Sequence, residues 1–340
     1  MFNHTPLPIF IMELYTHVDL PNDFPRITHR DRLMLLGSCF ASHMGERLSR
    51  GKFCCDVNPY GVLYNPLSIS AALREMVAGK VYTADGLFFH NGCWHSPMHH
   101  GDFSSSSAEE TLRRINMRLQ QASDTVRQLD WLLLTLGTAW VYEDRETGSI
   151  VGNCHKLPER CFVRRRLSVD EIVRDYVSLF SGLFARLPHL RVLFTVSPIR
   201  HVRDGLHANQ LSKATLLLAV EQICQAFPGQ VFYFPAYEIV LDELRDYRFY
   251  ADDLVHPSGK AVDYVWERFV KVCVSSESLQ IMEESENISR MLQHKPFRPE
   301  SEEYKRFLGQ IVLKIERLNG KYPYLDFQNE RETCHIRLNE

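Results

Sequence analysis

Two widely separated segments of the sequence carry the residue types that nucleophilic hydrolysis requires. Ser38 follows a short apolar run and a glycine, and such a strand-to-helix turn exposes a hydroxyl beside the amides that open a helix. Far along the chain, Asp253 stands three residues before His256. An imidazole can take the proton of a serine near neutral pH, and a carboxylate on its other nitrogen fixes the tautomer. These three residues predict a catalytic triad.

Each part of this triad also has a simpler interpretation. Ser38 is well placed to be the N-cap of the following helix, and Asp253 with His256 could belong to a solvated loop before another helix. Cys39 adds a thiol beside Ser38, but neighbouring side chains at such a turn point apart, so only one of them can meet His256. This turn geometry leaves open which of the two residues is the nucleophile; if Ser38 has that role, we expect Cys39 to pack as a small hydrophobe.

The elements that must position these residues alternate between short apolar runs and amphipathic stretches. Strands are predicted at residues 33–36, 53–57, 131–136, 191–196 and 230–234. Helices are predicted between them, including residues 41–48 and 209–227. Because this alternation gives parallel strands with right-handed crossovers, we predict an α/β fold with a doubly wound parallel sheet. Ligands bind such sheets outside the carboxyl ends of the strands, where Ser38 lies.

Three segments fall outside this alternation. Asn91 and Gly92 between apolar runs predict a tight hairpin, inserted at about residues 80–107. Beyond the main domain at 12–275, an apolar stripe at helical spacing predicts a helical C-terminal extension at 276–340, packed on that domain. Residues 1–11 are expected to be a disordered leader.

Histidines and arginines outside the triad suggest further sites. The predicted insertion contains four histidines: His90, His95, His99 and His100. A metal site is the less favoured interpretation, since Pro97 breaks the helix that would align His95 with His99, and we expect no metal and no cofactor. These side chains are expected to line a pocket or contact substrate. Residues 164–166, all arginine, are expected to form a solvated basic turn, with an anion contact as the alternative.

The composition limits the class of protein. Lys and Arg number 39 against 42 for Asp and Glu in 340 residues, so no basic excess supports a nucleic-acid partner. A hydrophobic content of 45% excludes disorder of the whole chain. No run of about 18 apolar residues predicts a membrane span, and no signal peptide is recognisable. The nine scattered cysteines lack CxxC pairs, which favours a reducing, cytoplasmic location.

Several short motifs, in a consistent order, resemble those of the GSCFA family, a branch of the SGNH (GDSL-like) hydrolase superfamily. The first is Gly37-Ser38-Cys39-Phe40-Ala41, and the last block contains Asp253-Leu-Val-His256. Further similar segments are 58–66 (Asn-Pro-Tyr-Gly-Val-Leu-Tyr-Asn-Pro), 137–140 (Gly-Thr-Ala-Trp), 153–156 (Asn-Cys-His-Lys), 197–201 (Ser-Pro-Ile-Arg-His) and 321–326 (Lys-Tyr-Pro-Tyr-Leu-Asp). The resemblance covers roughly residues 12–327.

This resemblance implies a flavodoxin-like, three-layer α/β/α sheet with Ser38 as nucleophile, His256 as base and Asp253 orienting the base. In the superfamily the oxyanion is held by the serine amide, a glycine in the second block and an asparagine in the third. Gly61 fits the second block, but Ala139 stands at the asparagine position. Losing one such donor typically costs about 2.7 to 4 kcal/mol in the reaction barrier. The side chains that could replace it are Thr138, Asn153 and His201.

The function expected from this resemblance is that of a serine hydrolase or acyltransferase acting on an ester, with O-acetylated carbohydrate as the favoured substrate. The alternative is a non-catalytic protein that binds an acyl or glycan ligand on the same fold, which Ala139 favours. The expected partner is therefore a small-molecule or carbohydrate ester, with neither nucleic acid nor membrane as a partner. The sequence leaves room for a homo-oligomer.

Overall fold

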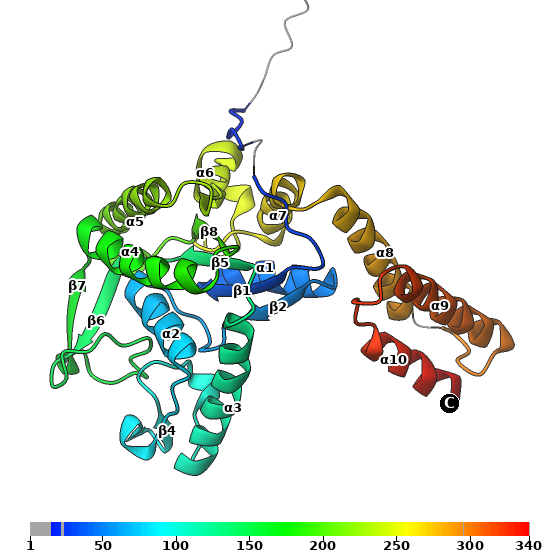
Figure 1. The fold of residues 1–340 in the computed structure, drawn as a ribbon, viewed down its shortest axis with the longest axis horizontal. Helices are drawn as coiled ribbons and strands as arrows, with labels where there is room; N and C mark the ends of the chain where they lie inside the picture. Colours follow the sequence, from blue (N-terminus) through cyan, green and yellow to red (C-terminus); the bar gives the residue numbers. More distant parts are fainter. Residues whose placement is uncertain (1–14, 22–23, 295, 340) are drawn as a thin grey trace, which may run out of the picture.

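A five-stranded parallel sheet forms the centre of the molecule (Figure 1). The computed structural model describes residues 15–21, 24–294 and 296–339; the leader predicted at 1–11 lies outside them. The strands are ordered β2-β1-β5-β8-β9, and their bounds are Arg32–Gly37 (β1), Cys54–Val57 (β2), Trp131–Leu136 (β5), Arg191–Val196 (β8) and Val231–Tyr233 (β9). In chain order this is the 2-1-3-4-5 arrangement of flavodoxin-like sheets, so the predicted fold class is confirmed.

Helices cover both faces of the sheet, because its strands are apolar on both sides. Alternate β1 residues show the division: Met34 and Leu36 belong to one apolar cluster, Leu33 and Leu35 to another. The first cluster is covered by α2 (Pro66–Ala78), α3 (Ala108–Val126), α4 (Val169–Arg186) and α5 (Leu206–Ala226). The second is covered by α1 (Cys39–Arg50) and α7 (Gly259–Cys273), while the short α6 (Ala236–Glu238) follows β9.

Two antiparallel hairpins interrupt the alternation of strands and helices along the chain. The predicted one pairs β3 (Phe88–His90) with β4 (Cys93–His95), and Asn91 and Gly92 both have positive φ at its turn, as a tight hairpin requires. The other was not predicted and pairs β6 (Trp140–Asp144) with β7 (Phe162–Arg166). Since β6 begins four residues after β5 ends, this second hairpin extends from the carboxyl edge of the sheet.

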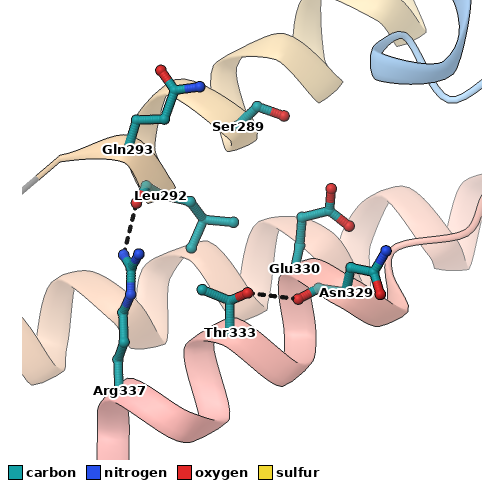
Figure 2. Close-up of a pocket in the computed structure, with 7 residues that line it drawn as sticks. All are labelled: Ser289, Leu292, Gln293, Asn329, Glu330, Thr333 and Arg337. Atoms are coloured by element: carbon teal, nitrogen blue, oxygen red, sulfur yellow. Dashed lines mark hydrogen bonds between the residues drawn. The ribbon is translucent and has the colours of Figure 1, made fainter. Parts of the chain in front are cut away.

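The C-terminal helices lie to one side of the sheet (Figure 1). They are α8 (Ser276–Gln293), α9 (Glu302–Lys321) and α10 (Gln328–Asn339), and they share an apolar cluster of their own. The Lys52 ammonium, 2.6 Å from the Glu330 carboxylate, joins α10 to the turn after α1. A hollow of about 440 Å³ lies between α8 and α10, where Arg337 donates a hydrogen bond to the Leu292 carbonyl (Figure 2). Within the described residues, no helix is long and apolar enough to cross a membrane.

Candidate active site

Ser38 stands at the junction of β1 and α1, and Gly37 allows it to do so. Gly37 has φ of +143°, and a Cβ added there would lie 2.1 Å from the Thr135 carbonyl oxygen of β5. Only glycine fits such a close approach of two strands. The Ser38 amide donates to this same carbonyl at 3.2 Å, which fixes the serine at the carboxyl edge of the sheet.

None of the residues that the structure describes forms a hydrogen bond with the Ser38 hydroxyl. Ser38 occupies the N-cap position of α1 with extended backbone angles, but its side chain does not accept a helix amide. The residue is 1% exposed, and its Oγ has no hydrogen-bond partner among the described residues. Buried hydroxyls are normally paired, so this one calls for an explanation other than capping.

The loop before α7 brings Asp253 and His256 together. Asp253 Oδ2 lies 2.6 Å from His256 Nδ1, while Asp253 Oδ1 accepts the amides of His256 and Val255, each at 2.9 Å. Leu254, with φ of +56°, turns the backbone between them. Hydrogen bonds from the two amides and the imidazole lower the pKa of Asp253 to about 2. The carboxylate is therefore ionised at neutral pH and favours the tautomer with a proton on Nδ1.

The structure does not join the two parts of the predicted triad by a hydrogen bond. Ser38 Oγ is without a partner, whereas the His256 and Asp253 side chains are about half exposed, at 53% and 50%. In unliganded enzymes such catalytic hydrogen bonds are often long and tighten only when substrate binds.

The backbone groups expected to hold an oxyanion are already engaged. The Gly61 amide donates to the Asn58 carbonyl at 2.8 Å, just as the Ser38 amide donates to Thr135. Gly61 has φ of +76°, and a Cβ added there would lie 2.2 Å from that of His100. The second block is thus a crowded turn. Its Asn58 side chain, which sequence reasoning missed, accepts from the Gly37 amide at 2.9 Å.

Two of the side chains considered as substitutes for the missing asparagine are used locally. Thr138 Oγ1 lies 3.0 Å from Ser212 Oγ and accepts the Trp140 amide at 3.1 Å. The side-chain oxygen Oδ1 of Asn153 accepts a hydrogen bond from the His155 amide at 2.9 Å, within the loop between β6 and β7. Both side chains support turns, and the structure shows neither in contact with Ser38.

His201 is the third candidate and has a different environment. Burial, followed by the nearby charge of Lys213, lowers its pKa to about 4, while Asp204 and the Gly137 carbonyl act in the opposite direction. His256 also lowers the pKa of His201 through its charge. The His201 imidazole is therefore neutral at pH 7, in the neighbourhood of both the β5 end and the Asp253–His256 loop.

Tyr64 is a further residue of this edge that sequence reasoning missed, although it lies within the motif at 58–66. Its carbonyl accepts the amides of Gly137 and Thr138 at 2.8 and 3.0 Å. Its ring meets that of His201 edge to face with centroids 6.1 Å apart, and its hydroxyl lies 3.7 Å from Cys39 Sγ. Tyr64 thus bridges the ends of β1, β5 and β8.

Two histidines of the insertion, His95 and His99, are held by contacts within the protein. His99 is buried and stacks on Tyr60 with ring centroids 4.4 Å apart, and burial lowers its pKa to about 3. His95 lies between Ser104 Oγ, 2.7 Å from Nδ1, and the His90 carbonyl, 3.0 Å from Nε2. In the part of the chain that the structure describes, no group of three or more His, Cys, Asp or Glu residues could hold a metal ion.

The prediction of a basic turn at residues 164–166 is wrong. These arginines form the end of β7, where they pair with residues 140–142 of β6 in the two-stranded hairpin. The Arg164 guanidinium lies 4.3 Å from the centre of the Trp140 ring and pairs with Asp204. Arg165 lies 2.7 Å from the carboxylates of both Glu143 and Glu171. Two of the three charges are thus neutralised within the protein.

Two hollows of the surface lie away from these residues. One is the hollow between α8 and α10 described above, and another of about 500 Å³ lies between α5 and the edge strand β9. None of the predicted site residues lines either hollow.

Two family models and one solved structure match parts of this chain. A model of the GSCFA family matches residues 32–269, and a model described as the C-terminal domain of GSCFA domain proteins matches residues 285–340. A solved structure of an acetyl xylan esterase (Est2A) from the rumen bacterium Butyrivibrio proteoclasticus is similar over 75% of this chain, with 9% identity and a TM-score of 0.35. The match spans 64% of that esterase, less than two thirds of its length. No curated protein sequence matches the chain.

Proposed function

The chain belongs to the GSCFA family, and from that premise we propose that it is an SGNH-type serine hydrolase or acyltransferase acting on an ester. The observation that carries this proposal is the pairing of Asp253 with His256 at 2.6 Å, together with a buried Ser38 hydroxyl that has no hydrogen-bond partner among the described residues. A structural serine would cap its helix, whereas a nucleophile must keep its hydroxyl available.

In the proposed reaction, Ser38 Oγ attacks the ester carbonyl carbon and His256 Nε2 takes the hydroxyl proton. The Asp253 carboxylate accepts from Nδ1 and stabilises the imidazolium that forms. The tetrahedral intermediate then collapses to an acyl-serine, and the imidazolium gives its proton to the departing alcohol. Water or a sugar hydroxyl attacks the acyl-serine in a second step, with His256 again as base. Hydrolysis and transfer differ only in this acceptor.

Charge on the carbonyl oxygen must be stabilised in both steps. Among the three substitutes for the missing asparagine, we favour His201, because a neutral imidazole can donate one hydrogen bond without adding a competing acid. Its low pKa keeps it in that form throughout the physiological range. Thr138 and Asn153 are less suited, since their side chains already bond within their own turns.

We propose O-acetylated carbohydrate as the substrate class and the cytoplasm as the location. The substrate class rests on the superfamily that the motifs resemble, and a fold by itself does not specify a substrate. The location rests on the scattered, unpaired cysteines of the sequence.

The alternative function is a binding protein for an acyl or glycan ligand. It is favoured by Ala139 and by the absence, among the described residues, of a hydrogen bond between Ser38 and His256. The two functions differ in whether Ser38 is activated.

A fluorophosphonate probe, which reacts with activated serines, tests this difference. The wild-type protein is treated beside Ser38→Ala and His256→Ala, with Cys39→Ala as the matched control for the adjacent thiol. We expect labelling of the wild type and of Cys39→Ala, and none of Ser38→Ala or His256→Ala. Because the Ser38 hydroxyl has no hydrogen-bond partner among the described residues, the melting temperature of Ser38→Ala should also lie within a degree or two of that of the wild type.

Two results would contradict the proposal. Labelling that depends on Cys39 but not on Ser38 would assign the chemistry to the thiol. A folded wild-type protein that is not labelled, even in the presence of short-chain esters and acetylated sugars, would favour the binding protein.

A further inference from the structure

Helix α5 presents a buried polar face toward the ends of two sheet strands. Asn209, Ser212 and Lys213 are three and four residues apart, so they share one side of the helix. Each is only 1% exposed, although all three are polar and one is a lysine. Helix faces that pack against a sheet are ordinarily apolar, so a polar face at this position needs a reason.

Each of the three side chains holds a segment that carries a candidate site residue. Asn209 Oδ1 accepts the His201 amide at 3.0 Å. Ser212 Oγ accepts the Ala139 amide at 2.8 Å and lies 3.0 Å from Thr138 Oγ1.

Lys213 connects these two segments to each other. Its ammonium donates to the Gly137 carbonyl after β5 and to the Ser197 carbonyl after β8, both at 2.6 Å. Burying a lysine without a carboxylate partner costs free energy. Among the described residues, no carboxylate lies within ion-pair distance of the Lys213 ammonium, whose two hydrogen bonds go to backbone carbonyl groups. Burial, and the charge of Arg200, lower the pKa of Lys213 to about 7. The protein thus buries, at the carboxyl edge of the sheet, a lysine whose charge is readily lost above neutral pH.

Besides burial, several charged and polar groups affect the pKa of His201, and Lys213 is one of them. Lys213 from α5 and His256 from the loop before α7 oppose protonation of the imidazole, whereas Asp204 and the Gly137 carbonyl favour it. The ring of Tyr64 lies edge-on to His201, and the ring of Tyr237 lies 5.9 Å from the ammonium; neither ring carries a charge at neutral pH.

We infer that Asn209, Ser212 and Lys213 are positioning residues for the reaction proposed above, on which this inference rests. They fix the turn at Thr138 and Ala139 relative to the loop of His201, and the Lys213 ammonium adds to the burial that keeps the His201 imidazole uncharged. In this way α5 supports the third sequence block, which has Ala139 at the position of the asparagine.

The first test measures the rate of fluorophosphonate labelling of Ser38 in Ser212→Ala and in Lys213→Met, well below their melting temperatures. Thr215→Val is the matched control, since Thr215 is a nearly buried polar residue of α5 whose hydroxyl bonds only to the Leu211 carbonyl of its own helix. We expect the first two variants to be labelled about tenfold more slowly or worse, because small displacements of a site reduce rates strongly. The control should be labelled at the wild-type rate.

The second test does not depend on activity and follows the His201 imidazole by proton NMR as the pH is lowered. The signal is assigned by its loss in His201→Gln. In the wild type we expect His201 to stay neutral down to about pH 5, and in Lys213→Met its pKa should rise. Thr215→Val should leave this titration unchanged.

The two tests separate the failure of this inference from the failure of the proposed function. If Ser38 is labelled at the same rate in wild type, Ser212→Ala and Lys213→Met, the polar face is only structural and the inference is wrong. An unchanged His201 titration in Lys213→Met would refute the role of the charge. If the wild type is not labelled, the proposed function fails, while a raised His201 pKa would still establish the link between Lys213 and His201.

Discussion

Replacing Lys213 by methionine should change how the stability of the protein depends on pH. The ammonium is buried between the Gly137 and Ser197 carbonyls, and its pKa is lowered from 10.5 to about 7. The unfolded chain exposes the same lysine to water, where it stays protonated until about pH 10. Between these values the unfolded state binds more protons than the folded state, so the free energy of unfolding of the wild type rises with pH.

The expected size of the effect follows from the two pKa values. Below pH 7 the lysine is protonated in both states, and the folded protein bears the full cost of burying the charge. From pH 6 to pH 9 the folded lysine loses its proton, which stabilises the wild type by about 2.5 kcal/mol relative to its value at pH 6. Lys213→Met has no such group, so the difference in unfolding free energy between the two proteins should shift by this amount in favour of the wild type.

Urea denaturation followed by tryptophan fluorescence measures this difference at several pH values. The four tryptophans, Trp94, Trp131, Trp140 and Trp266, all precede the C-terminal helices, so the signal reports on the sheet and its insertions. Thr215→Val should run parallel to the wild type at every pH. A difference between wild type and Lys213→Met that stays constant from pH 6 to pH 9 would refute the argument from burial.

Two further predictions concern residues of the site. Gly61→Ala should destabilise the protein by about 1 to 3 kcal/mol, seen as a lower melting temperature, because φ is +76° and the new Cβ would collide with that of His100; an unchanged melting temperature would contradict this. Asp253→Asn should reduce fluorophosphonate labelling by orders of magnitude through the wrong tautomer of His256, while the melting temperature barely moves since the pair is half exposed. Retained labelling would show that the carboxylate does not orient the base.

Much of the fold could be predicted from the sequence because its signals are local. The run at residues 131–136 is apolar except for Thr135 and is followed by a glycine, a pattern typical of a strand that is buried on both faces. Asn91 and Gly92 specify their hairpin through their own backbone preferences. Asp253 and His256 are three residues apart, so their pairing also depends on a single loop.

What could not be predicted depends on partners distant in sequence. The arginines at 164–166 resemble a solvated turn until Asp204, Glu143 and Glu171 are known to neutralise two of them on β7. The spacing of apolar residues in α5 predicts that Leu211 faces the core of the protein, yet its side chain is 41% exposed, while the neighbouring Lys213 is buried. The start of α5 meets the carbonyl groups at strand ends rather than apolar side chains, and sequence periodicity carries no sign of this contact.

The separate apolar cluster of α8, α9 and α10 has a consequence for how the molecule comes apart. Ile281, Ile311 and Phe327 belong to this cluster and not to either cluster that lines the sheet. Units with their own cores can open independently, so heating should release these helices in a calorimetric step distinct from that of the sheet. The van't Hoff enthalpy of the whole transition would then be smaller than the calorimetric one. Amide hydrogens of α9 would exchange with solvent through an opening that leaves β5 protected.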